Sequence, residues 1–276
     1  MYQINATDIS KLRKITGAGM MDCKNALIEA EGDYDKAIEV IRKKGQAVAN
    51  KRADRIAGEG VVLAKVTEDN KFGAIIALNC ETDFVAKNDN FVAFTESILD
   101  AAIKNNPENL ESLKQIKINN TSIENLVTDK IAAIGEKIEL SYFEKITADK
   151  VVTYIHPGNK LASIIGFNKN NAELTVCKDI AMQVAAMNPV AIDIKDIPQN
   201  VVDKEIEIGK EQARLEGKPE NMVEKIAMGK LNKFYKESTL LNQDFIKDSK
   251  KTVKQYLNEA DKDLTVTAFK RCSLNI

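Results

Sequence analysis

Residues 61–79, VVLAKVTEDNKFGAIIALN, decide how this 276-residue chain folds. Val61–Val66 and Phe72–Asn79 are apolar runs rich in β-branched side chains, and the polar stretch Glu68–Asn70 between them has the composition of a turn. This pattern predicts two antiparallel strands joined by a short loop. A helix over Asn90–Lys104 follows, because apolar residues recur there at helical spacing.

The same order of elements recurs further along the chain. Val151–Ile155 and Leu161–Phe167 predict a second pair of strands, and Leu174–Met187 predicts a second helix. Internal similarity of this kind indicates a duplicated structural unit. We therefore predict an α+β fold whose core is a duplicated strand–strand–helix unit with antiparallel sheets, divided into subdomains at residues 59–148 and 149–240.

The segment before the first strand predicts a separate unit of three short helices over residues 1–45. Its apolar residues recur at helical spacing, and glycines are expected to end the three helices at Gly17, Gly32 and Gly45. The face that we expect to point inward on the first helix consists of Ile9, Leu12 and Ile15. A basic connector over residues 46–58 is expected to join this unit to the core.

Two further segments are predicted beyond the second helix of the core. Residues 199–235, approximately, form a charged helical hairpin that breaks at Gly217-Lys218-Pro219 and projects from the core. Residues 241–276 form a C-terminal module with a helix over Thr252–Leu257 and a strand over Leu264–Phe269.

Composition excludes several classes of function. The 40 basic and 41 acidic residues give a net charge of −1, and aromatic residues make up 5% with no Trp, so neither clustered positive charge nor a base-stacking surface is expected. The longest apolar run, Ala74–Leu78, is far too short to cross a bilayer, and the first residues do not resemble a secretory signal. We expect a soluble, cytoplasmic protein that binds neither nucleic acid nor membrane directly.

Nothing in the sequence predicts an enzyme, a metal site or a cofactor. The four cysteines lie far apart, without zinc-ligand spacing, and are expected to be buried, reduced thiols: Cys23, Cys80, Cys177 and Cys272. Thr16–Gly19 superficially resembles a phosphate loop, but it joins two predicted helices and no strand precedes it. The single histidine, His156, stands before Pro157-Gly158 in a predicted turn and has no obvious partner for acid–base chemistry.

One stretch stands out as a candidate for binding. Thr82, Asp83, Phe84 and Val85 lie between the second strand and the first core helix, in a predicted exposed loop. Two interpretations are open from composition alone. Phe84 could fold back onto the core with Asp83 capping a turn, or its ring could be offered to a partner.

Longer motifs give this stretch a context. The segments LRKITGAGMMDCKNAL (12–27), NCETDFVAKNDNF (79–91), IAMQVAAMNP (180–189) and EGKPENMVEKIAMGKLNKFYKES (216–238) resemble bacterial elongation factor Ts. The resemblance covers nearly the whole chain in order. It implies an N-terminal ubiquitin-associated-like helical domain, a two-part α+β core, a helical hairpin and a C-terminal module.

The resemblance also implies a function. Members of this family exchange guanine nucleotide on elongation factor Tu, binding it with GDP and without nucleotide, and Thr82–Val85 corresponds to the loop that disturbs its magnesium site. Met20 and Met21 in the N-terminal motif, and His156 in the second subdomain, correspond to further partner contacts. Whether two copies pair into a homodimer, through the core or the hairpin, is left open by the sequence.

Two other classes remain as alternatives. The chain could be a non-catalytic interaction adaptor that uses its N-terminal helical domain, or a hydrolase using Asp83 and His156, for which no other sequence feature argues.

Overall fold

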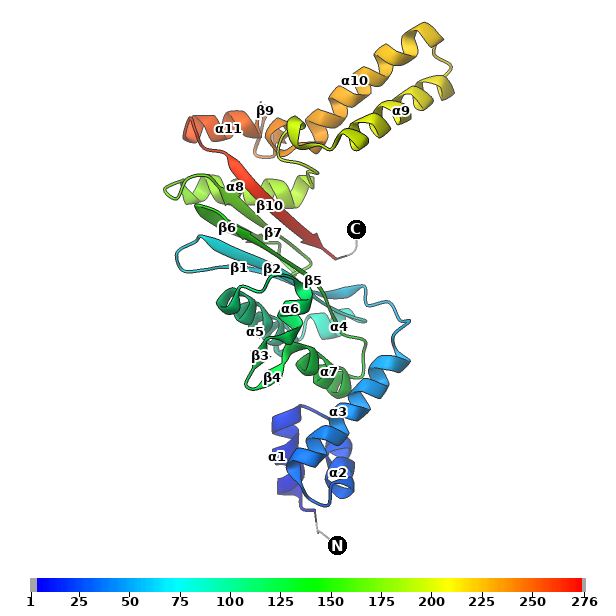
Figure 1. The fold of residues 1–276 in the computed structure, drawn as a ribbon, viewed down its shortest axis with the longest axis vertical. Coiled ribbons are helices and arrows are strands. Elements are labelled where there is room, and N and C mark those ends of the chain that lie inside the picture. Colours follow the sequence, from blue (N-terminus) through cyan, green and yellow to red (C-terminus); the bar gives the residue numbers. More distant parts are fainter. Residues whose placement is uncertain (1–3, 275–276) are drawn as a thin grey trace.

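The computed structural model of the protein describes residues 4–274. Three N-terminal helices lie at one end of an elongated molecule, a helical hairpin lies at the other, and two three-stranded sheets lie between them (Figure 1). The sheets pack face to face, and helices cover their outer faces, so the core is a four-layered α/β/β/α sandwich. Within residues 4–274, no helix has both the length and the apolar character needed to cross a membrane.

The first half of the sandwich is an antiparallel sheet in the order β1–β2–β5 with helices on its outer face. Its strands are β1 (Glu59–Val66), β2 (Phe72–Cys80) and β5 (Glu139–Thr147). Between β2 and β5 come α4 (Asp83–Ala86), α5 (Asp89–Asn105), α6 (Leu110–Gln115), β3 (Lys117–Ile118), β4 (Thr121–Ser122) and α7 (Ile123–Ile134). The short elements α4, α6, β3 and β4 were not expected, since so few residues carry no readable periodicity.

The second half repeats this topology. Its sheet has the order β6–β7–β10 and is again antiparallel, with helices inserted in the chain between the second and third strands. The elements are β6 (Lys150–Ile155), β7 (Leu161–Phe167), α8 (Leu174–Met187), α11 (Val253–Ala260) and β10 (Val266–Ser273). The predicted α+β fold with a duplicated unit is confirmed. The C-terminal segment supplies β10 and α11, so it completes the second sheet.

Both faces of the central strands are buried, which explains their continuous apolar sequence. Along β2, Ala74 and Ile76 face the helical layer, whereas Ile75 and Ala77 face the other sheet. Along β7, Ile164 likewise faces the first sheet. Because successive side chains of a strand point to opposite faces, a strand buried on both sides has no polar alternation.

The three N-terminal helices are α1 (Ala6–Thr16), α2 (Met20–Glu29) and α3 (Tyr34–Lys51). Gly17 ends α1 in the left-handed conformation as predicted, but α3 continues through Gly45 to Lys51. A Cβ at Gly45 would lie 2.8 Å from the Thr128 carbonyl oxygen of α7, so this glycine permits close packing of α3 on α7 rather than ending a helix. Ile15, expected to point inward, is 57% exposed.

The hairpin consists of α9 (Gln199–Leu215) and α10 (Glu220–Ser238), which meet as predicted at the Gly217 turn. Gly209 lets the helices approach closely, since a Cβ there would lie 3.1 Å from Ala227 Cα. At its base, Gln183 of α8 donates a 3.1 Å hydrogen bond to buried Gln243. The base also contains η1 (Ile194–Asp196), η2 (Leu240–Asn242), β8 (Asp244–Phe245) and β9 (Asp248–Thr252).

Candidate functional site

The Thr82–Val85 stretch begins a one-turn helix, α4, rather than the predicted loop. Thr82 caps this helix by accepting a 3.4 Å hydrogen bond from Val85 N. Ala86 is buried and Val85 half-buried, but the Phe84 side chain is 84% exposed. Phe84 therefore does not fold back onto the core, and Thr82 rather than Asp83 supplies the cap.

Glu136, in the loop between α7 and β5, holds the start of α4 in place. Its carboxylate accepts hydrogen bonds from Thr82 Oγ1 at 2.7 Å, Thr82 N at 3.1 Å and Glu81 N at 3.1 Å. Three donors on one charged acceptor fix the direction in which the chain leaves β2. The exposed ring of Phe84 is thus carried on an anchored turn.

Glu81 in turn accepts hydrogen bonds from the loop that carries Glu136 and from the basic connector. Its carboxylate accepts from Lys137 N at 2.6 Å, Arg52 Nη1 at 2.6 Å and Arg55 Nη1 at 3.0 Å. Burial alone would raise the pKa of Glu81, but these hydrogen bonds to the charged form lower it to about 2. The basic connector therefore has a structural role: it neutralises Glu81 beneath α4.

Asp83 is turned toward solvent beside two cations. Its carboxylate accepts a 2.6 Å hydrogen bond from Lys87, which lowers the pKa of Asp83, and Lys160 contributes through its charge. Lys160 pairs with Glu59 of β1 at 2.6 Å. The β6–β7 turn that carries Lys160 and His156 is therefore tied to the strand that pairs with the end of β2.

An open groove of about 720 Å³ lies beside Phe84. It is lined by α4, α5, α7 and the turn between α1 and α2: Gly17, Phe84, Val85, Asn88, Asn90, Phe91, Ala93, Phe94, Lys130, Ala133 and Ile134. The α1–α2 turn approaches α7 closely, since a Cβ at Gly17 would lie 3.9 Å from Ala133 Cβ. The N-terminal helices and the core thus form this groove together.

Met20 and Met21 begin α2 directly after this turn. Their side chains are 55% and 64% exposed, although neither lines the groove. Large exposed apolar side chains close to an apolar groove are typical of a protein-binding surface.

Sequence reasoning missed Lys130 and Glu136. No motif marks either residue, because the side chains and backbone groups around them come from distant segments.

His156 lies apart from the groove on the β6–β7 turn. It is exposed, and its Nδ1 is 2.9 Å from the hydroxyl of Tyr154. Asn159, three residues later, adopts a left-handed conformation and accepts a 2.7 Å hydrogen bond from Val62 N of the other sheet. Among residues 4–274, no hydrogen bond joins His156 to a carboxylate, so the structure contains no Asp83–His156 pair for hydrolysis.

The cysteines and the potential metal ligands were predicted to carry no chemistry, and the structure describes where they lie. All four cysteines are buried, and burial raises the pKa of Cys80 to about 12 and those of Cys177 and Cys272 to about 11, so these three thiols stay protonated near neutral pH. No group of three or more potential ligands in the described part could hold a metal ion.

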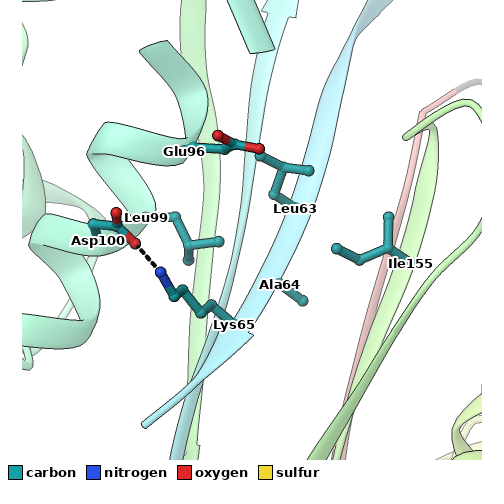
Figure 2. A pocket seen from close by; sticks show the side chains of 7 residues that line it. All are labelled: Leu63, Ala64, Lys65, Glu96, Leu99, Asp100 and Ile155. Carbon is teal, nitrogen blue, oxygen red and sulfur yellow. Dashed lines mark hydrogen bonds and ion pairs between the residues drawn. The ribbon is translucent and has the colours of Figure 1, made fainter. Parts of the chain in front are cut away.

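A second cavity, of about 330 Å³, lies at the seam between the two halves of the core (Figure 2). Leu63 of β1, Leu99 of α5 and Ile155 of β6 line it, and Lys65 reaches across to Asp100 of α5 at 2.5 Å. Figure 2 shows this ion pair at the side of the cavity. The lining also includes Ala64 and Glu96, so apolar residues and three charged residues share its walls, and its cation is already paired.

Comparison with known proteins places these features in a family. A family model described as Elongation factor TS matches residues 81–275. The chain is 51% identical to Elongation factor Ts of Porphyromonas gingivalis over 99% of its own length and 98% of that protein's. It is 49% identical to Elongation factor Ts of Christiangramia forsetii over 99% of its length and 100% of the relative's. The chain therefore belongs to the elongation factor Ts family, the nucleotide exchange factors that act on elongation factor Tu in translation.

Proposed function

We propose that this protein releases GDP from elongation factor Tu by pressing the Phe84 side chain into the nucleotide-binding domain, where it disturbs the magnesium site. The observation that carries the proposal is a phenyl ring left 84% exposed on a turn held by three hydrogen bonds to Glu136. A free aromatic ring on an anchored backbone can bind a partner with little ordering cost.

Physical chemistry supports a mechanism without covalent steps. Mg²⁺ demands near-ideal octahedral geometry at about 2.0–2.1 Å, so small displacements of its ligands weaken it, and with it the bound nucleotide phosphates. Burying the Phe84 ring contributes at most about 4–6 kcal/mol, from roughly 25 cal/mol/Å² over roughly 150–250 Å². By linkage, GDP weakens the factor's binding by the same ratio as the factor weakens that of GDP.

A second contact region is required, because association entropy and distortion of the partner consume much of this free energy. The groove beside Phe84 and the exposed Met20 and Met21 form that region in our proposal. His156, on the exposed β6–β7 turn, contacts another domain of elongation factor Tu. Thr82, Asp83 and Val85 orient the ring and contact the partner around it.

The test is the rate of GDP release from elongation factor Tu, followed by the fluorescence of a labelled GDP. Phe84→Ala should reduce the stimulated rate by about tenfold or more and leave the unfolding midpoint unchanged, since the ring makes little contact with the protein's own core. Leu174→Ala is the matched control, because it truncates a half-exposed apolar side chain on α8. A Phe84→Ala protein that exchanges nucleotide at the wild-type rate would refute the proposal.

A further inference from the structure

Lys130 is a charged side chain that has no charged partner among the described residues and lies in an otherwise uncharged groove. It lies on α7 among apolar and amide side chains, and it is the only ionisable residue that lines the groove in the described part of the chain. Its Nζ stands 4.9 Å from the centre of the Phe94 ring. This is a cation–π contact, which stabilises an ammonium group only partially.

No carboxylate of residues 4–274 forms an ion pair with Lys130. Its chain neighbour Asp129 is on another side of the helix, where it accepts from Arg42 Nε at 3.2 Å and Arg42 Nη2 at 3.4 Å. Burial lowers the pKa of Lys130. The ammonium group has therefore lost part of its hydration without gaining an opposite charge.

We propose that Lys130 is a recognition residue that binds a carboxylate of elongation factor Tu when a segment of that protein, acidic at one position and apolar beside it, fills the groove. This inference rests on the proposed function, because it places the occupant of the groove on the same partner. It adds a charged specificity determinant that lies outside the Thr82–Val85 stretch.

The chemistry of the groove favours a carboxylate over other anions. A phosphate group is normally held by a cluster of positive charges, whereas this groove offers one ammonium group and two asparagine side chains among phenyl rings and aliphatic side chains. One Asp or Glu flanked by apolar residues matches this lining in charge and in polarity. Binding it would give Lys130 an opposite charge, in a site that the bound segment would shield from water.

The experiment measures the affinity of the full-length protein for nucleotide-free elongation factor Tu by calorimetry, between 0.05 and 0.3 M NaCl. The variants are Lys130→Met, which keeps an apolar stem over Phe94, and Lys130→Arg, which keeps the charge. Lys104→Met removes an equal charge from the exposed last turn of α5 and is the matched control. The unfolding midpoint of each variant is measured alongside, as is its oligomeric state.

We expect Lys130→Met to raise Kd about tenfold and to flatten the salt dependence, while Lys130→Arg stays within about threefold of wild type and Lys104→Met within about twofold. Equal Kd values for wild type and Lys130→Met would overturn the inference. So would an equal loss in Lys130→Arg, which would indicate packing rather than charge. A change in self-association with unaltered partner affinity would assign the groove to a second copy of this chain.

The two proposals fail differently. If the wild-type protein neither binds elongation factor Tu nor accelerates GDP release, both are wrong. If wild type does both and Phe84→Ala slows exchange, but Lys130→Met binds like wild type, only the role of Lys130 is wrong.

Discussion

Removing Glu136 should loosen α4 without substituting any residue that is proposed to contact the partner. The change is Glu136→Ala, which deletes the carboxylate that accepts from Thr82 Oγ1 at 2.7 Å and from Thr82 N and Glu81 N at 3.1 Å each. A hydrogen bond to a charged group contributes about 1.5–3 kcal/mol, and water can reach this half-buried site to replace part of each bond. We therefore expect a loss of about 2–4 kcal/mol in the free energy of unfolding.

The same change should weaken exchange. A frayed α4 must be ordered again on binding, at about 1–2 kcal/mol for each backbone residue, so even limited fraying costs about 2 kcal/mol, or roughly 30-fold in affinity for elongation factor Tu. Urea unfolding gives the stability, and titration of the factor against the rate of labelled-GDP release gives the apparent affinity. Glu139→Ala is the control, since this exposed carboxylate pairs only distantly with Lys137, at 3.9 Å.

The reasoning would be refuted if Glu136→Ala kept both the wild-type free energy of unfolding and the wild-type exchange curve. A stability loss with unaltered exchange would show that α4 orders itself without this anchor. Glu136→Gln, which retains one acceptor oxygen, should fall between wild type and Glu136→Ala in both measurements.

Two further changes test other parts of the structure. Folding lowers the pKa of Glu81 from its ordinary 4.5 to about 2, so the ionised form stabilises the fold above pH 4.5. This contribution is at most about 3 kcal/mol, and it is lost as the pH falls toward 2. In urea unfolding, wild type should therefore exceed Glu81→Gln at pH 7 and approach it near pH 2.5; a gap that is constant with pH would contradict the assignment. Gly45→Ala should destabilise the packing of α3 on α7 by about 1–3 kcal/mol, because the new Cβ would meet a backbone oxygen at 2.8 Å. The control Gly229→Ala has open space around its Cβ and should stabilise α10 by about 0.5–1 kcal/mol, so equal thermal unfolding midpoints for the two variants would contradict this account.

Elements with a long, regular pattern were predictable. The helix over Leu174–Met187 has the bounds expected from its periodicity, and the hairpin turns at Gly217 as expected. The strand pairs were also predictable, because an apolar run on each side of a polar turn needs only local information. The last strand, expected at Leu264–Phe269, instead runs over Val266–Ser273, since pairing with β7 determines its ends.

Errors arose where a distant segment decides the local structure. Glycine often follows the end of a helix, yet α3 continues through Gly45. Glycine is needed there because Thr128 and Ala132 of α7 leave no room for a side chain. Ile15 fits the apolar period of α1 but remains 57% exposed. Periodicity describes which side of an element is apolar, and only packing shows whether that side is covered.

The sequence by itself determined the duplicated α+β core and the helical hairpin. Through the resemblance it also determined the family and the choice of Thr82–Val85 as a candidate binding site. Tertiary structure alone decided that Phe84 is exposed, that Glu136 anchors the turn beneath it, and that Lys130 stands in a groove between the N-terminal helices and the core. The physical reason is range. Propensity and periodicity act between neighbours in the chain, whereas exposure, hydrogen-bond partners and the hydration of a charge depend on segments that meet only when the chain folds.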